Sequence, residues 1–131
     1  MLSNPSKYVV KALVYLVNNS SETHKVQAIE IALNCDIPKP FLSKLLRQLS
    51  SKNMISSTKG PNGGFYLSEA QLKGSLLDII VEVEGNDRLK MCVLNFDKCN
   101  AQNPCPIHFL VSPEKDELRN KFKNIRLENL R

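Results

Sequence analysis

The sequence lacks any hydrophobic run long enough to cross a membrane. Its apolar stretches are short, and Lys11 interrupts the run between Val10 and Leu13, far below the ~18 residues that a spanning helix needs. The first residues carry no basic region followed by an apolar run and a cleavage site, so we expect no secretion signal and a cytoplasmic protein. Internal repeats and low-complexity tracts are also absent, which leaves one ordinary domain with an appendage as the expectation.

The chain is also short of acidic residues relative to basic ones. Eighteen Lys and Arg residues face 13 Asp and Glu residues, which gives a formal charge of +5 and a pI of about 9.1. Pairing of two copies would double that charge and concentrate the protein near polyanions. The balance favours a nucleic-acid partner, although charge alone does not prove one, so the pattern along the chain must decide.

Three of the four cysteines lie with a histidine in one Pro- and Asn-rich segment. The spacing C-x6-C-x5-C-x2-H places Cys92, Cys99, Cys105 and His108 within 17 residues. Thiolate and imidazole are the side chains that bind soft or borderline metals, and cytoplasmic thiols stay reduced. Most zinc sites have a tight C-x2-C knuckle, which this segment lacks. Zinc therefore remains open, but a larger cofactor suits the wider loops better.

Helical periodicity predicts three helices in the first 50 residues. They cover 7–17, capped by Ser6, then 26–34, and then a stretch from about 38–40 to 49 that follows a four-residue turn. We expect Ile29 and Leu33 of the second helix and Phe41 of the third to face the core. The other side of the third helix is basic and polar, and its members are Lys39, Ser43, Lys44, Arg47 and Gln48. Two short helices of this kind predict a helix-turn-helix whose second helix enters the major groove of DNA.

A β-hairpin is predicted directly after this third helix. Strand-like residues at 54–57 and 65–67 flank a glycine-rich turn, as in the wing of a winged helix. At the tip, glycines permit close backbone approach and a lysine can reach a phosphate or the minor groove, and Lys7 is a further backbone contact. The wing residues that we expect at DNA are Lys59, Gly60, Asn62 and Gly63.

The rest of the chain predicts two more helices around the cysteine segment. One runs from a Ser75 cap to Gly85, and the last begins at Ser112-Pro113-Glu114 and is amphipathic enough to pack on a second copy of the protein. The predicted fold is mainly α with a small β-hairpin wing. Residues 1–85 would form a winged helix-turn-helix DNA-binding domain, and residues 86–131 a cysteine-containing sensor loop and a C-terminal dimerisation helix.

These motifs resemble the IscR/NsrR-like winged-helix transcriptional regulators of the Rrf-two family. The resemblance rests on the wing sequence KGPNGGF at 59–65, on the three cysteines, on CPIH at 105–108 and on NIRL at 124–127. It implies a homodimer on a pseudopalindromic operator, with an iron-sulfur cluster held by Cys92, Cys99, Cys105 and His108. Lys59 stands where the family usually has arginine, and the first loop is one residue longer than is common, so the cluster type is not implied.

The resulting functional prediction is a homodimeric DNA-binding regulator and not an enzyme. Its operator affinity would depend on an iron-sulfur cluster that senses redox state, nitric oxide or iron-sulfur supply. The alternatives are a cluster-free thiol sensor, a zinc protein, or, with less support, a thiol enzyme that uses a cysteine beside His108. Against the enzyme, no glycine-rich oxyanion or phosphate loop accompanies the cysteine and histidine.

Overall fold

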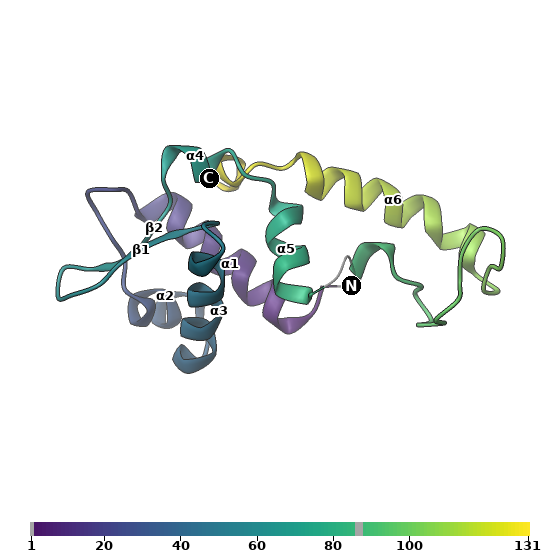
Figure 1. Cartoon of the computed structure of the whole chain (residues 1–131), viewed down its shortest axis with the longest axis horizontal. Coiled ribbons are helices and arrows are strands. Elements are labelled where there is room, and N and C mark those ends of the chain that lie inside the picture. Colours follow the sequence, from purple (N-terminus) through teal and green to yellow (C-terminus); the bar gives the residue numbers. More distant parts are fainter. Residues whose placement is uncertain (1, 86–87) are drawn as a thin grey trace.

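The chain folds into a head of packed helices with a β-hairpin, and one long helix projects from the head to the cysteine segment (Figure 1). The computed structural model describes residues 2–85 and 88–131. In chain order the elements are α1 (Asn4–Asn19), α2 (Ala28–Cys35), α3 (Lys39–Ser51), β1 (Ser56–Thr58), β2 (Gly64–Tyr66), α4 (Glu69–Leu72), α5 (Leu76–Glu84), the 3-10 turn η1 (Arg88–Lys90), α6 (His108–Asn124) and the 3-10 turn η2 (Leu127–Leu130). The predicted fold class, mainly α with one small antiparallel hairpin, is confirmed.

The core forms where the apolar stripes of α1, α2, α3 and α5 meet. Leu13 and Leu16 of α1, Leu46 of α3 and Ile80 of α5 are all buried there. Fully burying a side chain of this size stabilises the fold by about 1.5–3 kcal/mol. This packing fixes α3 against the rest of the head with its other side open to solvent.

The start of α1 differs from the prediction. Ser3, and not Ser6, is the N-cap, because the Ser3 hydroxyl accepts a hydrogen bond from the Ser6 backbone N–H at 3.3 Å. Ser6 lies inside the helix, fully buried, and its hydroxyl donates to a carboxylate oxygen of Glu84 at 2.5 Å. The helix also continues through residues 18 and 19, two residues beyond the predicted end at 17.

Three apolar residues of the helix-turn-helix were expected in the core, but they are exposed. α2 begins at Ala28, two residues later than predicted, and its inward face is made by Ile31 and Ala32. Leu33 is consequently 76% exposed and Ile29 41% exposed. Phe41 was expected in the core but is 38% exposed, because its ring packs edge to face on Tyr8 at the surface, with centroids 5.6 Å apart.

The hairpin has a third short partner from outside the predicted wing. Its register pairs Ser56 with Tyr66 and Ser57 with Phe65. Val26 joins the other edge of β2, where its backbone exchanges hydrogen bonds of 2.9 and 2.7 Å with Phe65. The residue that the periodicity assigned to the second helix therefore anchors the wing to the head.

The last helix starts earlier than predicted. α6 begins at His108 and continues through Pro113, although proline cannot donate the interior helix hydrogen bond. Its C-terminal end returns to the head, where the Leu76 N–H donates to Ile125 O at 2.9 Å and the Leu127 N–H donates to Gly74 O at 3.0 Å. The core thus contains side chains from both of the predicted regions, 1–85 and 86–131. Among the described residues, no helix has the length and apolar character needed to span a bilayer.

Candidate metal centre and nucleic-acid interface

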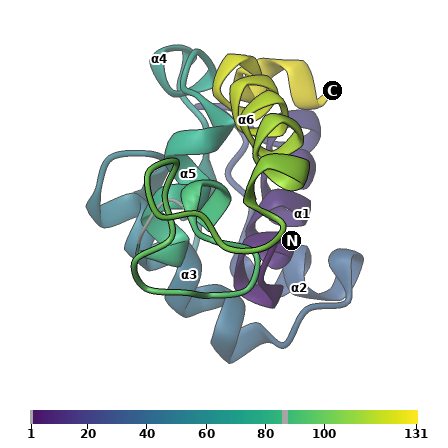
Figure 2. The same cartoon turned by 90° about the vertical axis from the view of Figure 1, so that its right-hand side faces the viewer.

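Asparagine-based turns fold the cysteine segment back on itself. Asn95 has a φ of 61° and its N–H donates to Cys92 O at 3.0 Å, which closes a tight turn after the first cysteine. Asn100 Oδ1 accepts from the N–H groups of Gln102 and Asn103, both at 2.8 Å, in the loop before the third cysteine. Figure 2 shows these loops end-on, beside the first turn of α6. The turns explain how cysteines seven and six positions apart in the sequence come together.

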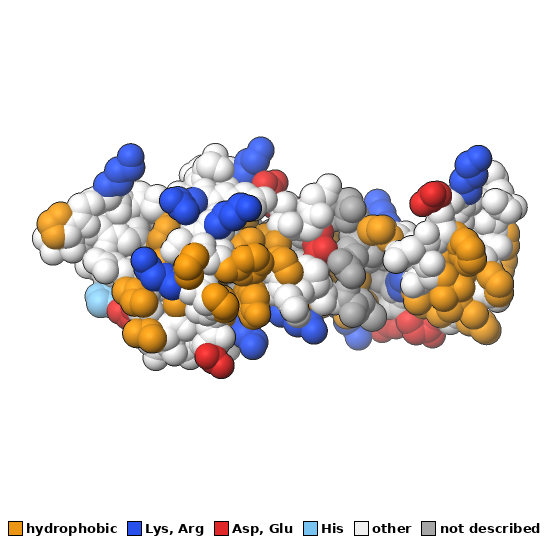
Figure 3. All heavy atoms as spheres, turned by 90° about the horizontal axis from the view of Figure 1, so that it is seen from below, with side chains coloured by type: hydrophobic (Ala, Val, Ile, Leu, Met, Phe, Trp, Pro, Cys, Tyr) orange, Lys and Arg blue, Asp and Glu red, His pale blue; other side chains and the backbone are white. Residues whose placement is uncertain are grey.

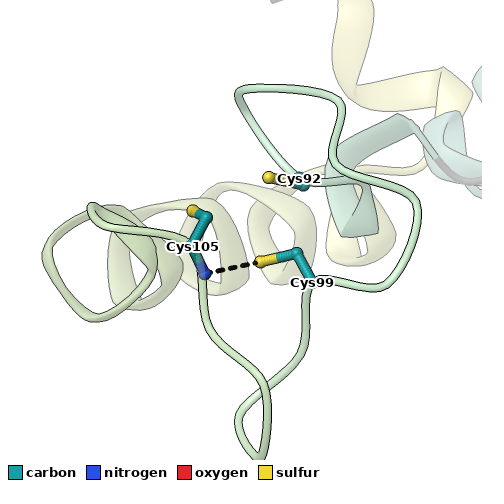
Figure 4. Close-up of side chains that lie close together, drawn as sticks. All are labelled: Cys92, Cys99 and Cys105. Carbon is teal, nitrogen blue, oxygen red and sulfur yellow. Dashed lines mark hydrogen bonds between the residues drawn. The ribbon is translucent and has the colours of Figure 1, made fainter.

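The three thiols converge on one point at the start of α6. The Sγ atoms of Cys92, Cys99 and Cys105 all lie within 4.8 Å of one another, and the Cys105 N–H donates to Cys99 Sγ at 3.3 Å (Figure 4). His108, the first residue of α6, lies beside this set, with its Nδ1 3.3 Å from Cys99 Sγ. The structure therefore brings the three predicted cysteines together and places His108 next to one of them.

Burial and hydrogen bonds in the segment shift the pKa values of Cys92 and Cys99 in opposite directions. Desolvation raises the pKa of Cys92, but the backbone N–H groups of Phe96 and Leu94 and the neighbouring thiols favour its thiolate more strongly, and the pKa falls to about 7. For Cys99 the Cys105 N–H lowers the pKa, whereas desolvation and the two adjacent thiols raise it, and the net shift is upward. Because its pKa is lowered while that of Cys99 is raised, Cys92 ionises at a lower pH than Cys99.

The donor set fits a thiolate-held metal or cluster. Sulfur and imidazole nitrogen are ligands of iron-sulfur and zinc centres, and here three half-buried sulfur atoms lie together on one loop, with the His108 ring next to Cys99 at the start of α6. A hollow of about 500 Å³ borders Cys92 and has apolar walls that include Leu89, Val93 and Val111. The fourth cysteine, Cys35, lies apart from this set, half-buried against the core with its Sγ 3.8 Å from Lys11 O.

The helix-turn-helix presents most of the predicted DNA-contacting side chains to solvent. Asp36, whose φ is 55°, is the C-cap that follows α2, and buried Ile37 anchors the turn before α3. On α3, Lys39, Lys44 and Arg47 are exposed and Ser43 is half-buried. Lys7 is exposed on α1.

Gln48 is placed differently from the rest of the basic face of α3. It is half-buried, and its Nε2 donates to the main-chain oxygen of Glu82 at 3.1 Å and to the Glu82 carboxylate at 3.3 Å. The side chain is therefore held against α5.

The wing tip depends on glycine for steric reasons. Lys59, Gly60 and Asn62 are exposed, whereas Gly63 is buried under its own turn. A Cβ on Gly63 would lie 2.2 Å from Thr58 O, and the N–H of Gly63 donates to Gly60 O at 3.0 Å. No larger residue fits this turn without moving its backbone.

The structure adds a lysine that the sequence patterns did not single out. Lys25 precedes the edge residue Val26, and its Nζ lies 5.4 Å from the centroid of the Tyr66 ring. A hollow of about 440 Å³ between α2 and the wing is lined by Lys25, Gln27 and Asn62, among others. The only sign of Lys25 in the sequence was a positive charge next to the strand-forming residue Val26.

Comparisons with known proteins agree with the winged-helix fold described above. The family model Rrf2, described as an iron-dependent transcriptional regulator, matches residues 2–131. An Aquifex aeolicus (strain VF5) protein named as a candidate HTH-type transcriptional regulator is 35% identical over 132 residues, which cover 99% of this chain and 90% of that protein. The HTH-type transcriptional regulator IscR of Enterobacter sp. (strain 638) is 26% identical over 98% of this chain and 78% of its own length. Among solved structures, CymR (YrzC), the global cysteine regulator of B. subtilis, has a TM-score of 0.77 at 21% identity and covers 99% of this chain and 95% of its own.

Proposed function

Since this chain belongs to the Rrf2 family of iron-dependent transcriptional regulators, we propose that it binds operator DNA as a homodimer and that an iron-sulfur cluster sets its affinity. The expectation that it is a regulator and not an enzyme is confirmed by relatives that are themselves named as transcriptional regulators. The observation that carries the cluster proposal is the convergence of three Sγ atoms within 4.8 Å.

Cys92, Cys99, Cys105 and His108 would hold the cluster, which when bound supplies an inorganic centre that oxidants and nitric oxide attack. The chain contributes the two loops that bring the ligands together and the first turn of α6 that positions His108. The cluster type is left open, because four ligands of this kind suit more than one nuclearity.

For DNA, we place α3 in the major groove and the wing over the flanking minor groove. Exposed Lys39, Lys44 and Arg47 would supply salt-dependent affinity, and Ser43 and Lys44 would read base edges. The backbone at Gly60 and Gly63 lets the wing approach closely, with Lys59 and Asn62 beside it, and Lys7 would contact a phosphate. Gln48 would have to release Glu82 before it could read a base. Because the proposed partner is DNA, we expect the protein to act in the cytoplasm.

An exposed apolar surface supports the homodimer. It surrounds the cysteine segment and the start of α6, at the right-hand end of the molecule in Figure 3, and its members are Met91, Val93, Leu94, Phe96, Phe109 and Leu110. A monomer rarely leaves such a cluster in water. Two copies would carry their α3 helices to major grooves one duplex turn apart, about 34 Å.

The test is anoxic purification followed by iron and sulfide analysis and a gel shift against operator DNA selected from a random library. We expect brown protein that contains iron and acid-labile sulfide, and operator affinity that changes when the cluster is removed. Cys105→Ser should lose iron, whereas the matched control Cys35→Ser should keep it, because Cys35 lies outside the cluster site. Colourless wild-type protein with three freely alkylated thiols would refute the cluster proposal.

A cofactor-free thiol sensor is the second candidate, and the low pKa of Cys92, about 7, favours it. An oxidant such as a peroxide would accept two electrons and two protons from Cys92 and a neighbouring thiol, and one S–S bond would form. The same preparation separates the two candidates. A thiol sensor would show no iron, and peroxide treatment would produce a disulfide and a change in operator affinity.

A further inference from the structure

One side chain of the recognition helix α3 is bonded to the end of α5. Gln48 Nε2 lies 3.1 Å from the main-chain oxygen of Glu82 and 3.3 Å from a carboxylate oxygen of the same residue. The last four carbonyls of a helix have no partner within that helix. Gln48 supplies one from a different helix, so α3 caps the C-terminal turn of α5.

The same turn of α5 is also bonded to α1. The Glu84 carboxylate accepts hydrogen bonds from the hydroxyls of Ser3 and Ser6 and from the Ser3 N–H at 3.3 Å. Ser3 is the N-cap of α1, and a negative charge at a helix N-terminus is favourable. One helical turn therefore holds both the recognition helix and the first helix of the head.

This turn leads directly into the cysteine segment. Gly85 ends α5 with a φ of 76°. Beyond it, Leu89 of η1 is 1% exposed, and η1 packs on α6 close to Cys92. The far end of α6 is fixed to the head through Leu127. A rearrangement of the cysteine segment would therefore reach the head at the end of α5, to which the segment is joined, and along α6, which packs on α5.

We propose that Gln48 is a positioning residue that transmits the state of the cysteine segment to the recognition helix through Glu82. This inference rests on the proposed function, since it assumes that the segment changes state and that α3 contacts DNA. While Gln48 is bonded to Glu82, it fixes the orientation of α3 from the side that packs on α5. When the last turn of α5 shifts, the bond is lost and α3 changes its angle to the operator.

Direct base reading is the competing role for Gln48. A glutamine reads adenine by donating from its amide nitrogen to N7 while its oxygen accepts from the N6 amino group. Here the amide nitrogen already donates to Glu82, so the two-bond contact with adenine is not available in this position. The two roles predict different effects of the same substitution.

The experiment measures operator affinity with and without the cluster for wild type, Gln48→Ala, Gln48→Glu and Glu82→Ala. Gln48→Glu is close to isosteric but has no donor, and its carboxylate would face two acceptor oxygens of Glu82. Arg47→Ala, one residue away on the exposed face of α3, is the matched control. Coupling between two sites is commonly 5- to 150-fold in affinity.

The quantity compared is the ratio of operator affinity with the cluster to operator affinity without it. If the inference holds, this ratio is at least about fivefold smaller in both Gln48 variants than in wild type, within that range of coupling. Glu82→Ala reduces the ratio less, because its main-chain oxygen remains, and adds nothing in the Gln48→Ala background. Arg47→Ala weakens binding equally in both states. In cluster-free protein, Gln48→Ala should also speed hydrogen exchange at the end of α5, a readout independent of DNA.

Two results overturn the inference. If Gln48→Ala lowers both affinities equally and leaves their ratio unchanged, Gln48 reads bases and transmits nothing, while the proposed function stands. If wild-type protein shows no operator affinity that depends on the cluster, the proposed function fails and this inference fails with it. Circular dichroism of each variant verifies that the helices are intact.

Discussion

Replacing Gly64 with alanine should separate the wing from the head. Gly64 has a φ of 148°, and a Cβ there would lie 2.7 Å from Val26 O and 2.8 Å from Val26 C. These atoms are backbone and belong to the pair of hydrogen bonds between Val26 and Phe65. Relief of the clash therefore requires that β2 move away from Val26.

Gly60→Ala is the matched control, because Gly60 also has a positive φ, 101°, but has nothing within 4 Å of the added Cβ. Both variants incur backbone strain of about 1–3 kcal/mol. Only Gly64→Ala also loses the two hydrogen bonds, each worth about 0.5–1.5 kcal/mol. The free energy of unfolding should therefore be lower in Gly64→Ala than in Gly60→Ala by about 1–3 kcal/mol.

Urea unfolding followed by circular dichroism measures this difference. With a slope of about 2 kcal/mol per molar, the Gly64→Ala midpoint should fall about 0.5–1.5 M below that of Gly60→Ala. Equal midpoints would refute the reasoning, because they would mean that the contact between Val26 and β2 adds nothing to the stability of the head. Operator affinity measured below both midpoints should fall for Gly64→Ala, since its wing is no longer held against the head.

The remaining predictions concern the cysteine centre, the recognition helix and the tail. Because the pKa of Cys92 is lowered to about 7, its alkylation by iodoacetamide in cofactor-free protein should rise through pH 7, well below the range of an ordinary thiol; a rise only above pH 8 would contradict the assigned hydrogen bonds. Lys44→Ala should weaken operator binding and reduce the slope of log affinity against log salt by about 0.9; an unchanged slope would remove Lys44 from the phosphate contacts. Leu127→Ala should lower the free energy of unfolding by about 2–5 kcal/mol, since this side chain is 1% exposed. Leu33→Ala, at a 76% exposed position, should change it by less than about 0.5 kcal/mol.

Much of the fold could be predicted because its signals are local. The Ser75 cap and the glycine end of α5 at Gly85 both lie where expected, since each depends on a few neighbouring residues. Ile29 and Leu33 were mispredicted as buried because α2 turns Ile31 and Ala32 to the core and leaves these two on its other side, and the start of α2 was predicted two residues too early. Periodicity alone does not fix that start when a competing partner, here β2, takes Val26 into a strand pairing.

The candidate cluster ligands were identifiable from residue type and spacing, because thiol and imidazole chemistry is carried by the side chains themselves. The chain sequence also determined which residues of α3 are cationic. Other features were decided only by tertiary structure. The hydrogen bonds from Gln48 to Glu82 and from Ser6 to Glu84 join residues 34 and 78 positions apart. The return of Leu127 to the core also joins distant parts of the chain, since its N–H donates to Gly74 O. Such contacts exist because several helices pack at once, and no local pattern specifies which side chain will find an unpaired carbonyl or a buried carboxylate on another helix.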